Sequence, residues 1–143
     1  MKLQNLINLF WRLIYGEWDE ARQPELFSRF ATIFDFQTWL VSNGFKWRSD
    51  GLNFSRETDT FERPGQVLAR GWANCGGFMR LFETFIKQRK AADEYIQFEL
   101  TAPAKILGVI PWTRWHYVTA FRIGAWWYVQ SNIAFMAIAN EAD

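Results

Sequence analysis

The chain has 143 residues, of which 50% are hydrophobic and 19% are aromatic. A chain of this length and apolar content can bury one sizeable core, so residues 1–143 are expected to form a single ordered domain. Sixteen basic and fifteen acidic residues give a formal net charge of +1, and no block of lysine or arginine stands out. On this overall balance, electrostatic capture of nucleic acid or of anionic lipid is not expected.

The cysteine content limits the chemistry further. Because Cys75 is the single cysteine, a disulfide within the chain is impossible. The sequence therefore gives no indication that the protein belongs to an oxidising compartment. Residues 1–15 are apolar, but polar side chains interrupt the apolar run, so they do not match a signal peptide, and they are too short to span a bilayer. We therefore expect a cytoplasmic protein without a transmembrane segment. The interrupting residues are Gln4, Asn5, Asn8 and Arg12.

The first third of the chain is expected to be helical. Apolar residues at helical spacing in residues 1–15 predict an amphipathic helix lying on the domain, with a helix at a membrane interface as the alternative. A second apolar stripe follows Pro24, which suits a first helical position, and continues to Phe34. Asp35 is expected to cap a third short helix that Asn43 and Gly44 end. The first stripe consists of Leu3, Leu6, Ile7, Phe10, Leu13 and Ile14.

The middle of the chain combines a loop with the strongest helix. Residues 45–61 lose the periodic pattern and predict a long surface loop anchored by Trp47 and Phe54. Pro64 then starts a short helical turn that Arg70 and Gly71 close. A regular apolar stripe with basic residues at its C-terminal end predicts the main helix at about Cys75–Arg89.

The last third of the chain is expected to form strands. Residues 95–100 alternate like a strand, whereas residues 101–113 contain two prolines and a glycine and predict a loop. Residues 115–123 and 126–131 predict a β-hairpin closed by Gly124 and Ala125, and residues 133–139 add one more strand. Helices followed by strands predict an α+β fold, with N-terminal helices (1–34) packed on a core (35–139) that contains an antiparallel sheet.

Cys75 is a candidate nucleophile because of its place at the start of the main helix. Asn74 is a favourable N-cap, and the N–H groups and dipole of a helix N-terminus favour an anion, which lowers the pKa of a thiol. Gly76 and Gly77 leave no side chains beside the sulfur, so a substrate backbone could approach closely. The alternative is a buried cysteine that packs as a small hydrophobic residue.

His116 and Asn132 are the candidate partners of this thiol. His116 is the only histidine and has the pKa that suits proton transfer near neutrality, although a histidine among aromatic residues can also be part of a core. Asn132 could accept a hydrogen bond from the imidazole and orient it, or could simply suit a turn.

The register of the predicted hairpin decides whether these two residues meet. A two-residue loop of Gly124 and Ala125 sets His116 opposite Ile133 and turns Asn132 to the other face of the sheet. A three-residue loop or one β-bulge sets His116 opposite Asn132 instead. The triad hypothesis therefore predicts the odd loop or a bulge.

Three blocks in this order resemble the transglutaminase-like domains, which share a papain-like fold. Residues 64–87, in which the run 67–71 leads to Asn74, Cys75 and an apolar helix, resemble the cysteine block. Residues 115–118 resemble the histidine strand, and residues 124–132 resemble the block that ends in the acid. The resemblance covers about residues 36–133 and points to a small bacterial or phage-type member. Asn stands at 132, where the family usually has Asp, and at 74, where Asp is common.

The resemblance implies a thiol catalytic triad. Cys75 would attack an amide carbonyl, His116 would activate the thiol and protonate the leaving amine, and Asn132 would hold His116 in place. The resulting thioester would pass to water or to an amine. The Cys75 N–H would be one oxyanion donor, and the second would come from an indole N–H. The candidate indoles are Trp39, Trp47 and Trp72, which with Gly76 and Gly77 are the predicted substrate-binding residues.

No cofactor is expected. One cysteine and one histidine cannot form a zinc site by themselves, the chain has no glycine-rich phosphate loop and no G-x-S-x-G motif, and Asp50, Asp59 and Glu62 are poorly spaced for calcium. Two functions are open. One is a cysteine-dependent hydrolase (peptidase or amidase) or acyltransferase acting on peptide, isopeptide or peptidoglycan amide bonds. The other is a catalytically silent member of the fold, of a phage-encoded kind, that serves as a binding or assembly module.

Overall fold

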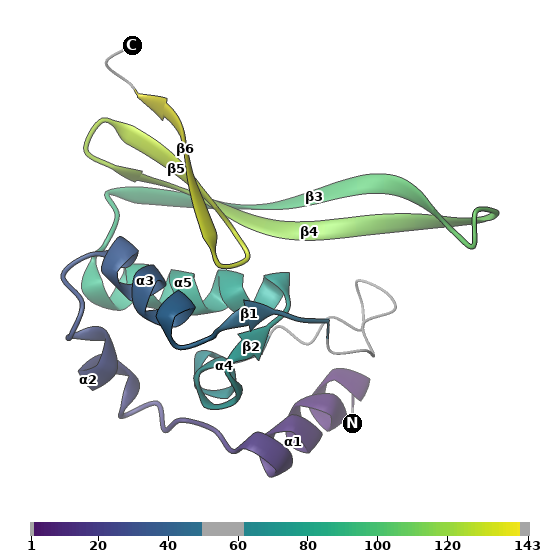
Figure 1. Ribbon diagram of the computed structural model, residues 1–143, viewed down its shortest axis with the longest axis horizontal. Helices are drawn as coiled ribbons and strands as arrows, with labels where there is room; N and C mark the ends of the chain where they lie inside the picture. The colour runs from purple at the N-terminus through teal and green to yellow at the C-terminus, as the bar shows by residue number, and fades with distance from the viewer. Residues whose placement is uncertain (1, 50–61, 141–143) are drawn as a thin grey trace.

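The computed structural model describes residues 2–49 and 62–140 and has a mixed α+β fold, as the order of helices and strands predicts. Helices lie beneath one face of an antiparallel sheet (Figure 1). The helices are α1 (Leu3–Tyr15), α2 (Gln23–Phe27), α3 (Ile33–Ser42), α4 (Pro64–Arg70) and α5 (Cys75–Arg89). The strands are β1 (Lys46–Trp47), β2 (Trp72–Ala73), β3 (Glu94–Ile106), β4 (Ile110–Ile123), β5 (Trp126–Ser131) and β6 (Ala134–Asn140).

The main sheet has the order β3-β4-β5-β6, and each strand runs antiparallel to its neighbours. Ile123 pairs with Trp126, so Gly124 and Ala125 form a two-residue loop, and Gly124 has the positive φ of 60° that such a turn favours. The pairing of β4 with β5 runs without a shift to Val118 and Ser131. β1 and β2 form a separate short parallel pair.

Helix α5 connects the helical layer to the sheet. It begins at Cys75, as predicted, because the side chain of Asn74 accepts a hydrogen bond from the Gly77 N–H at 2.8 Å. Its apolar face is buried between the sheet and the other helices. Phe36 of α3 stacks on Phe85 of α5 with ring centroids 4.6 Å apart. Aromatic side chains therefore make up much of the core through which α5 runs.

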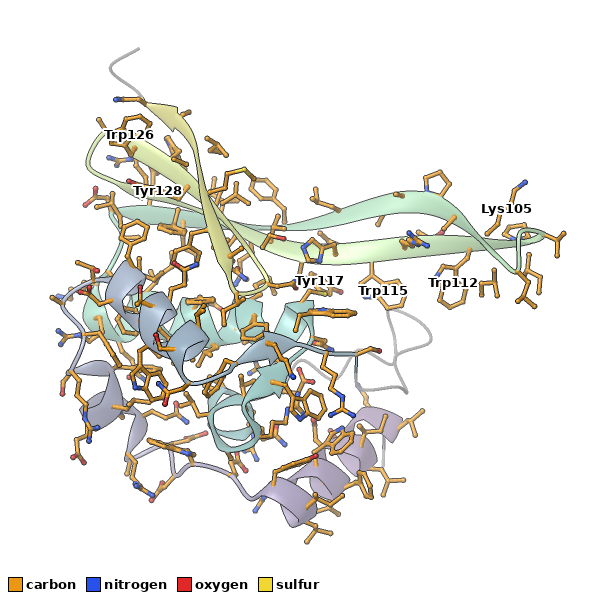
Figure 2. The ribbon with its side chains drawn as sticks, in the orientation of Figure 1. Lys105, Trp112, Trp115, Tyr117, Trp126 and Tyr128 are labelled. Carbon is orange, nitrogen blue, oxygen red and sulfur yellow. The ribbon has the colours of Figure 1, made fainter. Side chains whose placement is uncertain are left out.

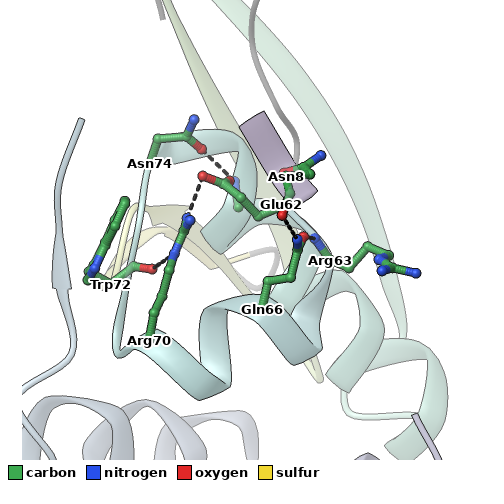
Figure 3. A network of polar contacts seen from close by, with 8 residues as sticks. Asn8, Glu62, Arg63, Gln66, Arg70, Trp72 and Asn74 are labelled. Atoms are coloured by element: carbon green, nitrogen blue, oxygen red, sulfur yellow. Dashed lines mark hydrogen bonds and ion pairs between the residues drawn. The ribbon is translucent and has the colours of Figure 1, made fainter. Parts of the chain in front are cut away.

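A buried ion pair lies beneath the N-terminus of α5 (Figure 3). Glu62 accepts a hydrogen bond from Arg70 of α4, and both side chains are almost completely buried. Arg70 also donates to the Trp72 carbonyl at 2.8 Å, and its guanidinium lies 3.7 Å from the centre of the Trp72 ring. These contacts offset part of the desolvation of both charges and connect α4 to β2.

Helix α1 forms where the periodicity predicts it but packs with a different face. Ile7 is buried, Trp11 meets Trp72 edge to face at 5.1 Å, and Tyr15 also contacts Trp72. The other members of the predicted stripe are exposed, and Leu13 is 78% exposed. The helix therefore lies on the domain as expected, but it packs mainly through Trp11 and Tyr15, because these rings offer Trp72 a larger contact than the aliphatic stripe does.

The second and third helices differ from the prediction at one boundary. The apolar stripe after Pro24 is buried, but α2 ends at Phe27, and α3 starts at Ile33. Thr32, and not Asp35, is the N-cap of α3. Thr32 and Asp35 form a capping box, in which each side chain accepts from the other's backbone N–H at 3.1 Å.

The predicted loop at 101–113 is wrong, because these residues form the outer half of a long hairpin. β3 extends to Ile106 and β4 starts at Ile110. Pro103 and Pro111 fit there because β3 is an edge strand and β5 pairs with β4 only from Val118 onward, so each proline ring meets an open edge. The hairpin projects beyond the helices as an arm (Figure 1).

The predicted loop at 45–61 is described only in part. Lys46 and Trp47 form β1, which pairs with β2. Residues 50–61, which include the predicted anchor Phe54, lie outside the described residues.

Candidate functional site

A groove of about 590 Å³ opens between the start of α5, the end of β1 and the root of the arm. Two of its walls are the indoles of Trp112 and Trp115, which lie on the helix-facing side of β4 (Figure 2). The twist of the hairpin brings these rings together although they are three residues apart, and their centroids are 6.2 Å apart. The described residues that line the groove are Trp47, Ser49, Asn74, Cys75, Trp112, Arg114 and Trp115.

Cys75 lies at the floor of this groove. It is the first residue of α5 and is 7% exposed. Its side chain clusters with Met79 and Tyr117, and Trp115 packs against the same cluster. The sulfur therefore occupies the predicted place at the start of a buried helix, and aromatic side chains from β4 cover it.

His116 lies on the opposite face of β4 from Cys75. Its neighbours on the strand, Trp115 and Tyr117, both pack toward Cys75, and successive side chains of a strand point to opposite faces. The His116 Nε2 is 2.8 Å from the Ser131 Oγ, and burial lowers the pKa of His116 from its ordinary value. The structure does not bring the predicted nucleophile and the predicted base together.

Asn132 does not orient the imidazole either. The two-residue loop and the unshifted register place Ser131 beside His116, so neither the odd loop nor the bulge required by the triad is present between β4 and β5. Asn132 has a φ of 52°, and its carbonyl accepts from the Gln130 side chain at 2.5 Å. Its Oδ1 is buried without a hydrogen-bond partner among the described residues. The geometry makes Asn132 a turn residue.

The three candidate indoles lie in different places. Trp47 lines the groove, whereas Trp39 packs into the main core and stacks on Phe36. Trp72 is buried against Trp11, and its Nε1 has no hydrogen-bond partner among the described residues. Of the three, only Trp47 could touch a ligand in the groove.

The two glycines of the first turn of α5 are buried. A Cβ on Gly77 would lie 2.5 Å from Glu62 Oε2 and 2.9 Å from the Ala73 Cβ. Gly77 is therefore needed for the close approach of the buried carboxylate to the helix, a different role from the predicted access of a substrate to the sulfur. Gly76 is buried beside Cys75 and is not among the described residues that line the groove.

The sequence did not single out the residues of the arm that line the groove. Trp112 and Arg114 come from the segment at the border of the predicted loop, and Trp115 was assigned only to the histidine strand. The available signal is the pair of tryptophans that flank Thr113 and Arg114, because indoles beside a cation are frequent at recognition sites. Their convergence on Cys75 depends on the long hairpin and could not be foreseen.

Two further expectations concern metals and membranes. Within residues 2–49 and 62–140, no three His, Cys, Asp or Glu side chains gather as a metal site. Glu62 is paired with Arg70, and the other calcium candidates, Asp50 and Asp59, lie outside the described residues. In the same ranges, no helix has the length and apolar character needed to cross a bilayer.

Comparison with known proteins provides no relative: no family model, no curated protein and no solved structure matches the chain.

Proposed function

We propose that this protein is a binding module that holds an extended peptide segment in the tryptophan groove, on a catalytically silent transglutaminase-like core. The observation that carries the proposal is the division of groups between the two faces of β4. Trp112 and Trp115 line the groove above Cys75, while His116 is turned away and bonded to Ser131. The predicted base therefore lies on the other side of β4 from the thiol, and this arrangement favours recognition over nucleophilic attack.

The lining of the groove suits a peptide. Trp47, Trp112 and Trp115 offer flat apolar surfaces that lose little entropy on binding, and open aromatic-lined grooves are a common way to bind extended or proline-rich segments. Arg114 is the charged side chain among the described lining residues and can bind a carboxylate with two parallel hydrogen bonds. The proposed ligand is therefore an extended peptide with apolar side chains and at least one acidic residue.

An array of decapeptides tests the proposal. The wild type should retain acidic peptides rich in proline or aromatic residues, and Trp112→Ala or Trp115→Ala should weaken binding by roughly tenfold or more. Trp126→Ala is the matched control, because this indole is 44% exposed and lies at the other end of the sheet (Figure 2). Arg114→Gln should remove the preference for acidic peptides. Equal retention by the Trp112, Trp115 and Trp126 variants would contradict the proposal.

A cysteine hydrolase or acyltransferase is the second candidate, and one observation favours it. Cys75 lies at the N-terminus of α5 and lines the groove, where a substrate amide would pass. This function needs β4 to rearrange, or a base other than His116. The rate of Cys75 alkylation by iodoacetamide between pH 5 and 9 separates the two candidates.

The binding module predicts slow alkylation below about pH 8, no effect of His116→Ala on that rate, and full peptide binding by Cys75→Ser. Rapid alkylation at neutral pH that His116→Ala abolishes would support the enzyme instead.

A further inference from the structure

The tip of the β3–β4 arm, beyond Trp112 of the groove, exposes an apolar cluster away from the core. Ile106, Leu107, Val109 and Ile110 are all exposed there, with Leu107 89% and Val109 74% exposed. Figure 2 shows Lys105 at this end of the arm, beyond every helix. A two-stranded hairpin gains little stability by itself, so an arm of this length that ends in apolar side chains indicates a partner.

The turn at this tip has unusual chemistry. The Val109 N–H donates to the Ile106 carbonyl at 3.2 Å, and both central residues have positive φ, 53° for Leu107 and 75° for Gly108. Turns of this kind favour Asn, Asp or Gly at both positions, because a branched side chain is strained at positive φ. Leu107 is thus unfavourable in both conformation and hydration. Neither penalty is offset by packing within the chain.

The charges around the tip have one sign. No Asp or Glu occurs between Leu100 and Asn140, whereas Lys105 and Arg114 lie on the arm itself. The near-neutral total of the chain therefore hides a separation of charge, because the acidic residues of β3, Glu94 and Glu99, lie in the half of that strand away from the tip. An apolar tip with flanking cations complements a surface that is apolar inside and negatively charged outside.

We propose that the arm attaches the protein to an anionic lipid bilayer by inserting its tip into the interfacial region. Leu107, Val109 and their isoleucine neighbours would enter the boundary between headgroups and acyl chains, and Lys105 beside the turn would bind lipid phosphates. The arm projects beyond the body, so the tip can reach this depth without a collision (Figure 1). Insertion is limited to the turn, because the open strand edges of a hairpin cannot enter hydrocarbon.

Co-sedimentation with vesicles tests this attachment. The wild type should bind phosphatidylcholine vesicles that contain about 30 mol% phosphatidylserine more tightly than pure phosphatidylcholine vesicles. Leu107→Asn should bind the mixed vesicles roughly tenfold more weakly, since it removes apolar carbons from the inserted tip. Asn also suits positive φ, so this variant should stay folded, which circular dichroism checks. Lys105→Gln should weaken binding about fivefold, on the anionic vesicles only.

Leu13→Gln is the matched control, because Leu13 is comparably exposed but lies on α1. It should bind as the wild type does. A loss of binding in Leu13→Gln with none in Leu107→Asn would overturn the proposal and assign the lipid contact to α1. Absence of vesicle binding by the wild type would also overturn it. So would a dimer in analytical ultracentrifugation that Leu107→Asn converts to monomer, because the tip would then dock on a second copy.

Discussion

The His116 Nε2 lies 2.8 Å from the Ser131 Oγ, across the boundary between β4 and β5. Ser131 pairs directly with Val118, so His116 is its diagonal neighbour on the face of the sheet that α5 does not cover. Tyr117, which lies between His116 and Val118 in the sequence, packs against Cys75 on the other face. The Ser131 hydroxyl thus contacts the His116 imidazole where the triad hypothesis expects the Asn132 amide.

This environment predicts a loss of stability in mild acid. Burial lowers the folded-state pKa of His116 below 6.5, so at pH values just under 6.5 the unfolded chain binds a proton that the folded chain does not. The free energy of unfolding should therefore fall as the pH drops from about 6.5 to the lowered pKa of the folded state. Urea titrations at pH 7.5 and 5.5 measure the change. His116→Gln should flatten it, and an unchanged pH dependence in that variant would contradict the assignment.

The ion pair of Glu62 and Arg70 predicts a strong coupling between two substitutions. Either Glu62→Gln or Arg70→Met leaves one buried charge without its counter-charge and should lower the free energy of unfolding by about 3–5 kcal/mol. The double variant Glu62→Gln with Arg70→Met should lose less than the sum of the single losses. A double-mutant cycle by urea unfolding measures the coupling, and additive losses would count against it.

Gly77→Ala should destabilise the protein although alanine is the better helix former. The propensity gain is about 1 kcal/mol, but the new methyl group would overlap the Glu62 carboxylate and the Ala73 side chain, an overpacking that costs about 1–3 kcal/mol. The exposed Gln88 of the same helix provides the control, because Gln88→Ala changes only propensity. Thermal unfolding compares the two, and a Gly77→Ala variant as stable as Gln88→Ala would show that the carboxylate can move.

The tip of the arm predicts a stabilising substitution. Leu107→Asn relieves the penalty of a branched side chain at positive φ and removes no buried contact, so it should raise the free energy of unfolding by about 1 kcal/mol. Chemical denaturation measures this, with Val109→Asn as the comparison at an exposed position that is not among those of positive φ. If Leu107→Asn lowers stability, the turn is not strained.

Local patterns predict the elements of the fold well where one sequence signal is sufficient. The periodic apolar stripe with Asn74 in front gives α5, and Pro64 and Gly71 give α4. The arm was missed because prolines favour loops unless a strand edge lies open, and sequence alone does not show which edges are open. The packing face of α1 was missed for a similar reason, since the contact with Trp72 depends on tertiary structure.

The candidate site could be predicted as far as the place of Cys75. Whether His116 faces it depends on which side of β4 meets α5, and here the flanking side chains decide. Trp115 and Tyr117 are larger and more apolar than the imidazole, so burying them against the helix turns His116 outward. The face of the sheet to which Asn132 points depends on the length of the loop between β4 and β5. The sequence is compatible with both a two-residue and a three-residue loop.

The position of α1 has a consequence for the hydration of the interior. Trp11 meets Trp72 edge to face, its ring centre is 6.0 Å from the Arg70 guanidinium, and the Asn8 carbonyl accepts from the Gln66 side chain at 3.2 Å. The first helix thus covers part of the surface over the buried Arg70, which lies some sixty positions away in the chain. Detaching α1 would admit solvent to the Arg70 guanidinium and weaken its ion pair with Glu62, which packs against the first turn of α5. A change at the surface of the molecule would in this way alter the surroundings of the Cys75 thiol.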